Sequence, residues 1–187
     1  PLLRQQSVQS GQPCLCLSDF LRPRSQGIAD RIGLFASTVD KELEQSFPQD
    51  EYQHLLAQIL ADRLAEATAE LGHLQTRREW WGFSPDEELS IDQLFAEKYQ
   101  GKRPAVGYPS LPDQSINFLL DELIDMNSLG IELTETGAMK PHASTSGLIL
   151  SHPATRHFSV GPVGEDQLQD YAKRRNLPID WLRRFVC

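Results

Sequence analysis

The sequence predicts an α+β fold, a single domain in which a bent antiparallel sheet is flanked by helices. Short segments of alternating polarity indicate strands, and a 3.6-residue apolar period from about 50 to 78 indicates one long amphipathic helix. Strands and helices do not alternate regularly along the chain, which favours an antiparallel sheet over a doubly wound parallel one. The length of 187 residues suffices for one sizeable hydrophobic core.

Four segments are predicted to be strands. Residues 12–17 (QPCLCL) and 31–38 (RIGLFAST) are short, alternate in polarity and are bounded by Gly, Pro or Asp. Residues 144–150 (STSGLIL) and 156–163 (RHFSVGPV) are predicted to form a hairpin that turns at 152–155.

The long helix carries its apolar residues in one arc, where Arg63 is expected to pair with Glu66 or Glu70 rather than remain alone. The residues of the apolar arc are Tyr52, Leu55, Leu56, Ile59, Leu60, Leu64, Ala67, Leu71 and Leu74. Shorter helices begin at a capping box formed by Ser90 and Gln93, and next to Pro178. The ranges predicted for the shorter helices are 90–99, 115–126, 164–175 and 178–185.

The chain is acidic, since 26 Asp and Glu residues against 18 Lys and Arg give a net charge of −8. Its basic pairs are scattered, so neither nucleic acid nor an anionic membrane is an expected partner. No apolar run reaches the ~20 residues that a membrane span requires. Cys14, Cys16 and Cys187 lack metal-ligand spacing, and a reduced, cytoplasmic chain with structural thiols is predicted.

Signatures of catalysis are missing from the sequence, which has no GxGxxG, P-loop, HExxH or CxxC motif. Residues 143–147 (ASTSG) lack the first glycine of a GxSxG nucleophile elbow. His152 and His157 lie five residues apart, which fits a packed turn better than a metal site. Neither a catalytic residue nor a metal site is therefore predicted.

The segment 102–113 (KRPAVGYPSLPD) is the best candidate for a binding site. Its three prolines exclude both a helix interior and a central strand. Pro104 stiffens the backbone at Arg103, whose guanidinium then suits a carboxylate or a phosphate. Ala105 and Gly107 would let a ligand approach the main chain, and Tyr108 offers a flat face. The alternative is a purely structural loop whose arginine caps the preceding helix.

Eight segments together resemble one family, the C-terminal S-adenosylmethionine-binding activation domain of cobalamin-dependent methionine synthase. The signature RPxxGYP and its partner SGxxxSHP are the most specific of the matching motifs. In the family's order, the segments are LRQQ (3–6), CLSDF (16–20), ADRLAEA (61–67), WGFSPDE (81–87), YQGKRPAVGYPSLPD (99–113), LTETGAMKPHASTSG (133–147), LSHPATRHFSVGPV (150–163) and DQLQDYAKRR (166–175). The resemblance assigns 1–187 to this domain, without the N-terminal part that carries a ligand-binding aspartate. The chain also has Leu111, Gln114 and His157 where the family usually has Cys, His and Tyr.

The resemblance implies that the loop contacts S-adenosylmethionine. The implied binding residues are Arg103 for the methionyl carboxylate, Glu97 near the sulfonium, and Ala105, Gly107, Tyr108, His157 and Phe158 along the adenosine. Asp62 and Glu66 are implied on the surface that meets the cobalamin domain, and therefore in docking rather than ligand binding. A solvated helix edge is the alternative for these two acids.

The function that the resemblance implies is reactivation of methionine synthase (5-methyltetrahydrofolate–homocysteine methyltransferase) in methionine biosynthesis. The domain would present the methyl group of S-adenosylmethionine for reductive remethylation of cob(II)alamin, which a neighbouring cobalamin-binding domain carries. Flavodoxin or an equivalent reductase would supply the electron, and this chain would perform no catalysis by itself. The alternative is a stand-alone S-adenosylmethionine sensor, or a module that has lost its ligand. An independent methyltransferase is disfavoured because no acceptor site is visible.

Overall fold

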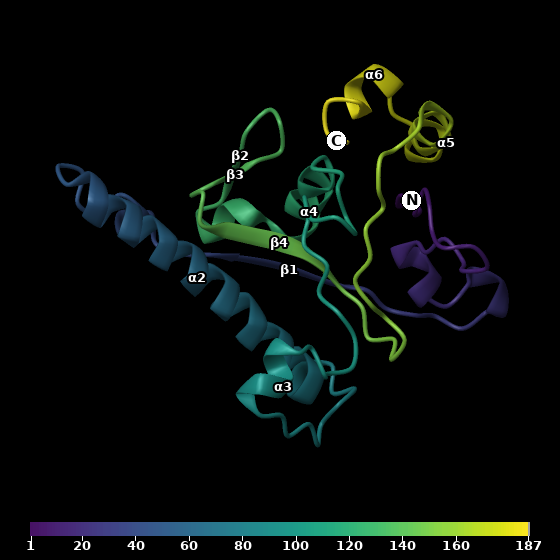
Figure 1. The fold of residues 1–187 in the computed structure, drawn as a ribbon, viewed down its shortest axis with the longest axis horizontal. Coiled ribbons are helices and arrows are strands. Elements are labelled where there is room, and N and C mark those ends of the chain that lie inside the picture. The colour runs from purple at the N-terminus through teal and green to yellow at the C-terminus, as the bar shows by residue number, and fades with distance from the viewer. Residues whose placement is uncertain (187) are drawn as a thin grey trace.

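Two small antiparallel sheets and the helices around them make up the computed structural model, which describes residues 1–186 (Figure 1). The first sheet pairs β1 (Gly33–Thr38) with β4 (Ser144–Ile149), in register from Gly33 opposite Ile149 to Thr38 opposite Ser144. The second sheet pairs β2 (Glu132–Leu133) with β3 (Met139–Lys140). The α+β class with antiparallel strands is thus confirmed.

The long helix is also confirmed, as α2 (Glu51–Gln75) followed by a π-helical turn (Thr76–Trp80). It begins where the Asp50 carboxylate accepts a hydrogen bond from the Gln53 N–H at 3.0 Å. The helix runs along one side of the molecule and contacts both β1 and β4 (Figure 1).

The face of α2 that rests on the sheet is not its leucine-rich arc. The buried residues of the helix recur at every fourth position and are Ala57, Ala61, Ala65, Ala69 and His73. Most side chains of the apolar arc are instead exposed, by 43–70% for Tyr52, Leu55, Leu56, Ile59, Leu60, Leu64 and Leu71, whereas Leu74 is half-buried. Alanine brings the helix close enough for the Ser37 hydroxyl of β1 to donate to the Ala65 carbonyl at 3.0 Å. Arg63 pairs with Glu66 at 3.0 Å, as expected, but on the exposed surface.

The predicted strand at 12–17 is wrong. Within it only Cys16 forms a β-bridge, to Arg4, and a 3₁₀ helix (Leu17–Phe20) follows at once. The Asp19 carboxylate accepts from the Cys16 N–H at 2.8 Å and forms a two-pronged pair with the Arg4 guanidinium. This cap turns the chain where the alternating pattern of the sequence indicated an extended strand.

The predicted hairpin is also wrong, because both edges of β4 have other partners. One edge pairs with β1, and the other pairs with the start of the loop, where Lys102 and Leu150 exchange backbone hydrogen bonds of 2.9 and 3.0 Å. Residues 156–163 instead run between the loop and the N-terminal segment. There the Val160 N–H donates to the Pro109 carbonyl at 2.8 Å, and the Gln6 N–H donates to the Val160 carbonyl at 2.9 Å.

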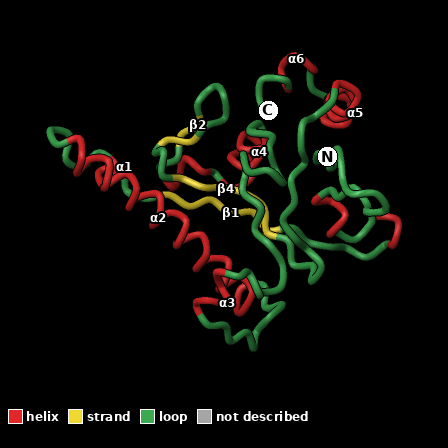
Figure 2. The backbone as a smooth tube through the Cα atoms, viewed as in Figure 1, coloured by secondary structure: helices red, strands yellow, loops and turns green. Residues whose placement is uncertain are grey.

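The four shorter helices form at the predicted places, each over fewer residues than predicted; long loops separate the first three, and a short turn joins the last two (Figure 2). They are α3 (Ile91–Phe95), α4 (Ile116–Ile124), α5 (Glu165–Arg175) and α6 (Ile179–Leu182). Ser90 and Gln93 form the expected capping box at α3. The one-turn helix α1 (Lys41–Glu44) was not predicted, and neither were the 3₁₀ turns Arg24–Gln26 and Met126–Leu129.

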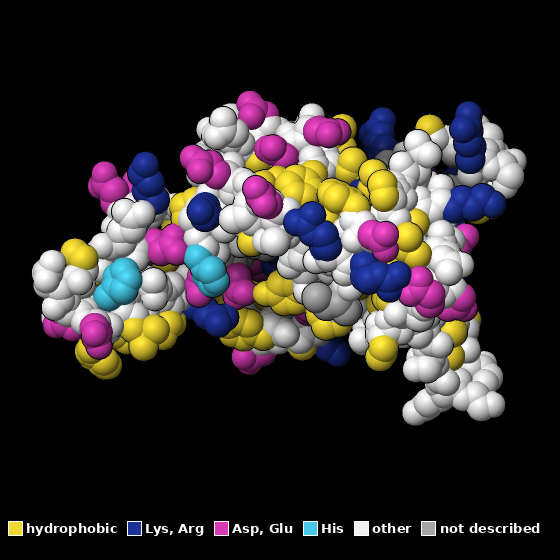
Figure 3. Space-filling model, turned by 90° about the horizontal axis from the view of Figure 1, so that it is seen from above, with side chains coloured by type: hydrophobic (Ala, Val, Ile, Leu, Met, Phe, Trp, Pro, Cys, Tyr) yellow, Lys and Arg dark blue, Asp and Glu magenta, His cyan; other side chains and the backbone are white. Residues whose placement is uncertain are grey.

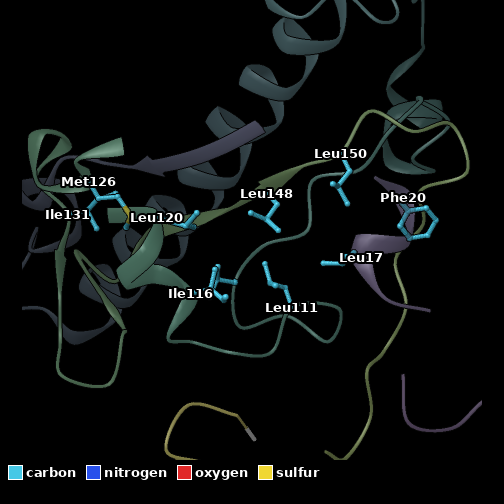
Figure 4. Close-up of a cluster of buried hydrophobic side chains, with 10 residues drawn as sticks. Leu17, Phe20, Leu111, Ile116, Leu120, Met126, Ile131, Leu148 and Leu150 are labelled. Atoms are coloured by element: carbon cyan, nitrogen blue, oxygen red, sulfur yellow. The ribbon is translucent and has the colours of Figure 1, made fainter. Parts of the chain in front are cut away.

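The hydrophobic core lies in two clusters, and the loop at 102–113 belongs to the first. Its Val106 and Leu111 pack with Leu148 and Leu150 and with Ile116 of α4 (Figure 4). The second cluster, under α5 and α6, consists of Leu3, Val160, Leu168, Tyr171, Ala172 and Leu182. The loop is therefore a structural part of the core as well as a candidate site.

Candidate ligand-binding site

A cavity of about 600 Å³ lies between the loop at 102–113, the middle of α2 and the segment around residue 157. Its lining residues are Glu66, Glu97, Arg103, Ala105, Tyr108, Pro109, Ser110, Thr145, His157 and Phe158. A volume of this size is typical of sites for small molecules and cofactors.

The start of the loop is held by Lys102. Its buried ammonium donates to the carbonyls of Glu97, Tyr99 and Gly101 at 3.1–3.2 Å, and burial lowers the pKa of this lysine. The backbone just beyond it runs antiparallel beside β4, so close that a side chain on Gly147 would collide with the Pro104 carbonyl. The glycine of the SG pair therefore allows the loop to lie directly on the sheet.

The end of the loop is held by Asp113, whose side chain is almost fully buried. Its carboxylate accepts from the Ser115 N–H at 2.8 Å and from the Tyr171 hydroxyl at 2.6 Å, and it forms an ion pair with Arg175. Burial and this carboxylate raise the pKa of Tyr171. Between the two anchors, Gly107 turns the chain with a φ of 87°, a conformation that favours glycine.

Arg103 leaves this firmly held backbone and reaches the cavity with a side chain that is 18% exposed. Its NH2 group lies 3.5 Å from Glu70 Oε2 of α2, and its guanidinium lies over the ring of Phe35 at 5.1 Å. Arg103 therefore contacts α2 rather than capping α3. Among residues 1–186 its buried Nε has no hydrogen-bond partner.

Two carboxylates that line the cavity are more exposed than this guanidinium. The side chains of Glu97 and Glu66 are 43% and 47% exposed. Glu97 Oε2 lies 3.6 Å from His157 Nε2, and the Tyr108 hydroxyl donates to Glu66 Oε1 at 3.4 Å. Burial, chiefly, lowers the pKa of His157, so the ring is neutral at neutral pH and does not cancel the charge of Glu97.

Most of the sequence-predicted binding residues meet in this cavity. Arg103, Ala105, Tyr108, Glu97, His157 and Phe158 all line it, so the loop and the segment at 157–158 face the same space. Gly107 is in the adjoining turn and does not line the cavity.

The two acids predicted for docking are separated. Glu66 lines the cavity, whereas Asp62 lies outside it, with its carboxylate 3.7 Å from His142. Pro109 and Ser110, which the sequence analysis did not single out, also line the cavity, as does Thr145. Their position beside the predicted residues, in the GYPS and STSG segments, is the feature of the sequence that indicates them.

The chemistry of the lining is that of a binding site. It offers one guanidinium, two carboxylates and the aromatic faces of Tyr108 and Phe158. In residues 1–186 no cluster of His, Cys, Asp and Glu is arranged to hold a metal ion. The helices of this part of the chain fall short of the length and apolar character needed to span a membrane. On the face in Figure 3, basic side chains lie scattered among acidic ones rather than in one patch.

The fold and the cavity together define an α+β domain suited to a small, charged and partly aromatic ligand. The chain belongs to the family of the activation domain of vitamin B12 dependent methionine synthase, whose model matches residues 1–176. The crystal structure of the MetH reactivation domain bound to AdoHcy is similar, with a TM-score of 0.91 and 40% sequence identity. The similarity covers 98% of this chain and 58% of that chain, so this chain spans less than two thirds of its length. The resemblance found in the sequence is confirmed.

Proposed function

We propose that this chain binds S-adenosylmethionine and presents its methyl group for the reductive remethylation of cob(II)alamin carried by a neighbouring domain. The observation that carries the proposal is the set of charges that line the cavity, where Arg103 is mostly buried and Glu97 and Glu66 are about half exposed. Membership of the activation-domain family supports it. So does the similar MetH domain, whose structure is described as bound to AdoHcy.

The charges of the proposed ligand complement those of the cavity. S-adenosylmethionine carries one carboxylate, one ammonium and one sulfonium, and the cavity offers one guanidinium and two carboxylates. A guanidinium binds a carboxylate with two parallel hydrogen bonds, and a carboxylate stabilises a nearby cation. The rings of Tyr108 and Phe158 offer faces on which the adenine can stack.

The different exposure of these groups gives the ligand an orientation. Arg103 would hold the methionyl carboxylate inside, while Glu97 and Glu66 would keep the two cationic groups near the mouth. The methyl group on the sulfonium would then face outward, towards a partner domain. When bound, the ligand supplies the transferable methyl group, and this chain contributes proximity and orientation rather than catalysis of its own.

The proposal includes partners that this chain does not contain. A cobalamin-binding domain would dock near the mouth of the cavity, where Asp62 and Glu66 lie on the exposed edge of α2. Flavodoxin or an equivalent reductase would supply the electron, and the setting would be the cytoplasm. Methionine biosynthesis is the process that this reactivation would serve.

Calorimetric titration with S-adenosylmethionine tests the binding step. Replacement of Arg103 by alanine should weaken binding by about 1.5–3 kcal/mol, or roughly 10- to 150-fold, as expected for a hydrogen bond to a charged group. Arg103→Lys should recover only part of the loss, since an ammonium does not replace the two-pronged guanidinium. Arg183→Ala, which removes an exposed arginine at the end of α6 whose partner Glu165 also lies outside the cavity, is the control and should bind as the wild type does. Unchanged affinity in Arg103→Ala would remove this residue from the site.

The role in reactivation needs a protein that also contains the cobalamin domain. There, Arg103→Ala should slow the return of methylcobalamin from cob(II)alamin in the presence of a reductant and S-adenosylmethionine. Tight ligand binding with no such dependence would instead indicate an S-adenosylmethionine sensor.

A further inference from the structure

A charged cluster, formed by Glu70, Arg77, Glu87 and Arg103, adjoins the cavity, and only its Arg103 lines it. Arg103 NH2 lies 3.5 Å from one oxygen of Glu70, and Arg77 NH1 lies 3.6 Å from the other. Arg77 in turn donates from Nε and NH2 to the two oxygens of Glu87, each at 2.8 Å. Glu70 is therefore shared by two guanidinium groups, one at the cavity and one inside the protein.

Arg77 is the fixed member of the charged cluster. Its side chain is fully buried, and its pair with Glu87 has the two-pronged geometry of a strong charge-assisted contact. The guanidinium carbon of Arg77 lies 4.0 Å from the centre of the Tyr99 ring, and the ammonium nitrogen of Lys102 lies 4.6 Å from the centre of the same ring. Because Arg77 is enclosed on all sides, it cannot move with Arg103, and Glu70 contacts a fixed guanidinium on its inner side.

Glu70 is held loosely by comparison. Its two contacts, at 3.5 and 3.6 Å, are longer than the 2.7–2.9 Å that is typical of charge-assisted hydrogen bonds. The buried side-chain atoms without a partner in residues 1–186 all belong to this cluster or to the neighbouring His73: Glu70 Oε1, both ring nitrogens of His73, Arg77 NH1 and Arg103 Nε. Unsatisfied buried polar groups cost free energy, and their concentration beside one cavity indicates a role in the site rather than in stability.

His73, next to the charged cluster, adds no charge to it at neutral pH. It is buried on α2 with its ring edge-on to Tyr99 at 5.2 Å. Burial, with further contributions from Arg77, Arg103 and Lys102, lowers the pKa of His73 to about 3. The neutral imidazole leaves the negative charge of Glu70 to the two guanidinium groups.

We propose that Glu70 is a positioning residue, which holds the guanidinium of Arg103 in the orientation that receives the carboxylate of the ligand. Arg77, itself fixed by Glu87, sets the place of Glu70. The inference rests on the proposed function and deepens it. A long arginine side chain loses rotamer freedom when it binds, and a contact that restricts it beforehand lowers that cost. The carboxylate of Glu70 beside it also offsets the charge of this mostly buried guanidinium.

The test compares two ligands and two matched variants. Glu70→Gln keeps the shape of the side chain and removes its charge. Glu79→Gln makes the same charge change at an exposed position in the π-helical turn that follows α2. Each protein is titrated with S-adenosylmethionine and with its decarboxylated form, which keeps the sulfonium, an amine and the adenosine but has no carboxylate for Arg103. We expect Glu70→Gln to weaken S-adenosylmethionine binding about tenfold, as coupled neighbours do, and to change binding of the decarboxylated form by less than about twofold. Glu79→Gln should change neither affinity.

The same titrations in an Arg103→Ala background complete the cycle. If Glu70 acts through Arg103, Glu70→Gln should have no further effect there. An equal loss for both ligands, or a loss that persists without Arg103, would show a general structural effect and overturn the inference. Wild-type affinity in Glu70→Gln would overturn it while leaving the proposed function intact. A wild-type chain that does not bind S-adenosylmethionine would overturn both.

Discussion

The loop at 102–113 and the helix α2 meet at the candidate site, but they are held in opposite ways. The loop has almost no regular structure, yet Lys102 fixes its start, Asp113 fixes its end, and Val106 and Leu111 lie in the core. The helix is regular for 25 residues, yet it rests on the sheet through alanines while its large apolar side chains are exposed.

This difference shows that regular secondary structure does not measure how firmly a segment is held. The number of buried anchors does, and by that measure the irregular loop is the more rigid support. The cavity forms where this loop faces the polar edge of α2, which carries Glu66 and Glu70. The most sensitive positions should therefore lie at the anchors of the loop.

The largest effect is expected at the end of the loop. Asp113→Ala would leave Arg175, whose side chain is 4% exposed, without its carboxylate, and breaking a buried pair typically costs about 3–5 kcal/mol. Urea unfolding measures the loss. Asp170→Ala, on the same helix α5, breaks an exposed pair with Arg174 and should cost less than about 1 kcal/mol. Similar losses in the two variants would mean that the loop is not held as firmly as its contacts indicate.

The second prediction concerns the two faces of α2. Ala65→Leu adds bulk where the helix touches the sheet, and overpacking a close contact typically destabilises by about 1–3 kcal/mol. Leu64→Gln, one residue earlier on the exposed arc, should change the free energy of unfolding by no more than about 0.5 kcal/mol. If the order were reversed in urea unfolding, the leucine arc would be packed in solution and the described face of α2 would be wrong.

The sequence predicted which part of the chain lines the cavity better than it predicted the packing of α2, for physical reasons. The prolines, Gly107 and Arg103 constrain the backbone locally, so their consequence can be read from neighbouring residues. On α2 the alanine stripe and the leucine arc share the helical period, and the period alone does not tell which face meets the sheet. Hydrophobicity favoured the leucines, whereas close approach of helix and strand required the alanines.

The remaining differences come from contacts between distant parts of the chain. The predicted hairpin was wrong because the start of the loop occupies the free edge of β4, which no local pattern shows. The charged cluster was not foreseen, because Glu70, Arg77 and Glu87 become neighbours of Arg103 only in the folded chain. Cys187, expected to be a structural thiol, lies outside the described residues.

A third prediction uses His73, which lies where α2 meets the charged cluster. Its pKa falls to about 3 in the folded protein, mainly through burial, against an unfolded value of about 6.5. The unfolded chain therefore binds the proton more readily, so this histidine favours folding above pH 6.5 and the benefit is lost as the pH falls towards 3. At pH 5.5 the loss should be about 1.4 kcal/mol relative to pH 7.5.

Urea unfolding of His73→Leu at the two pH values isolates this contribution. The variant should lose about 1.4 kcal/mol less stability between pH 7.5 and 5.5 than the wild type does. His142→Gln, which changes an exposed histidine near α2, is the control and should follow the wild type. If His73→Leu also followed the wild type, the ring would be more open to water than the packing around it indicates, and α2 would be loosely held on this side too.

The smallest effect is expected at Asp62, on the exposed edge of α2. Asp62 and Glu66 are one helical turn apart, but only Glu66 lines the cavity, and the Asp62 carboxylate faces His142. Asp62→Asn should leave the affinity for S-adenosylmethionine within a few tenths of a kcal/mol, because the site lacks a contact with it. Glu66→Gln should weaken binding of S-adenosylmethionine more than that of AdoHcy, which lacks the sulfonium charge.

In a protein that also contains the cobalamin domain, Asp62→Asn should reduce occupancy of the docked, reactivating state. Calorimetry on this chain measures the effect on ligand affinity, and spectra of the longer protein measure the effect on docking. The outcome decides how far the contrast between loop and helix extends. If Asp62 affects only docking, the polar edge of α2 divides within one turn, with Glu66 serving the cavity and Asp62 the partner. A loss of ligand affinity in Asp62→Asn comparable to that in Glu66→Gln would show that this edge of the helix moves as one unit with the ligand. The helix would then be as much a part of the binding site as the loop is.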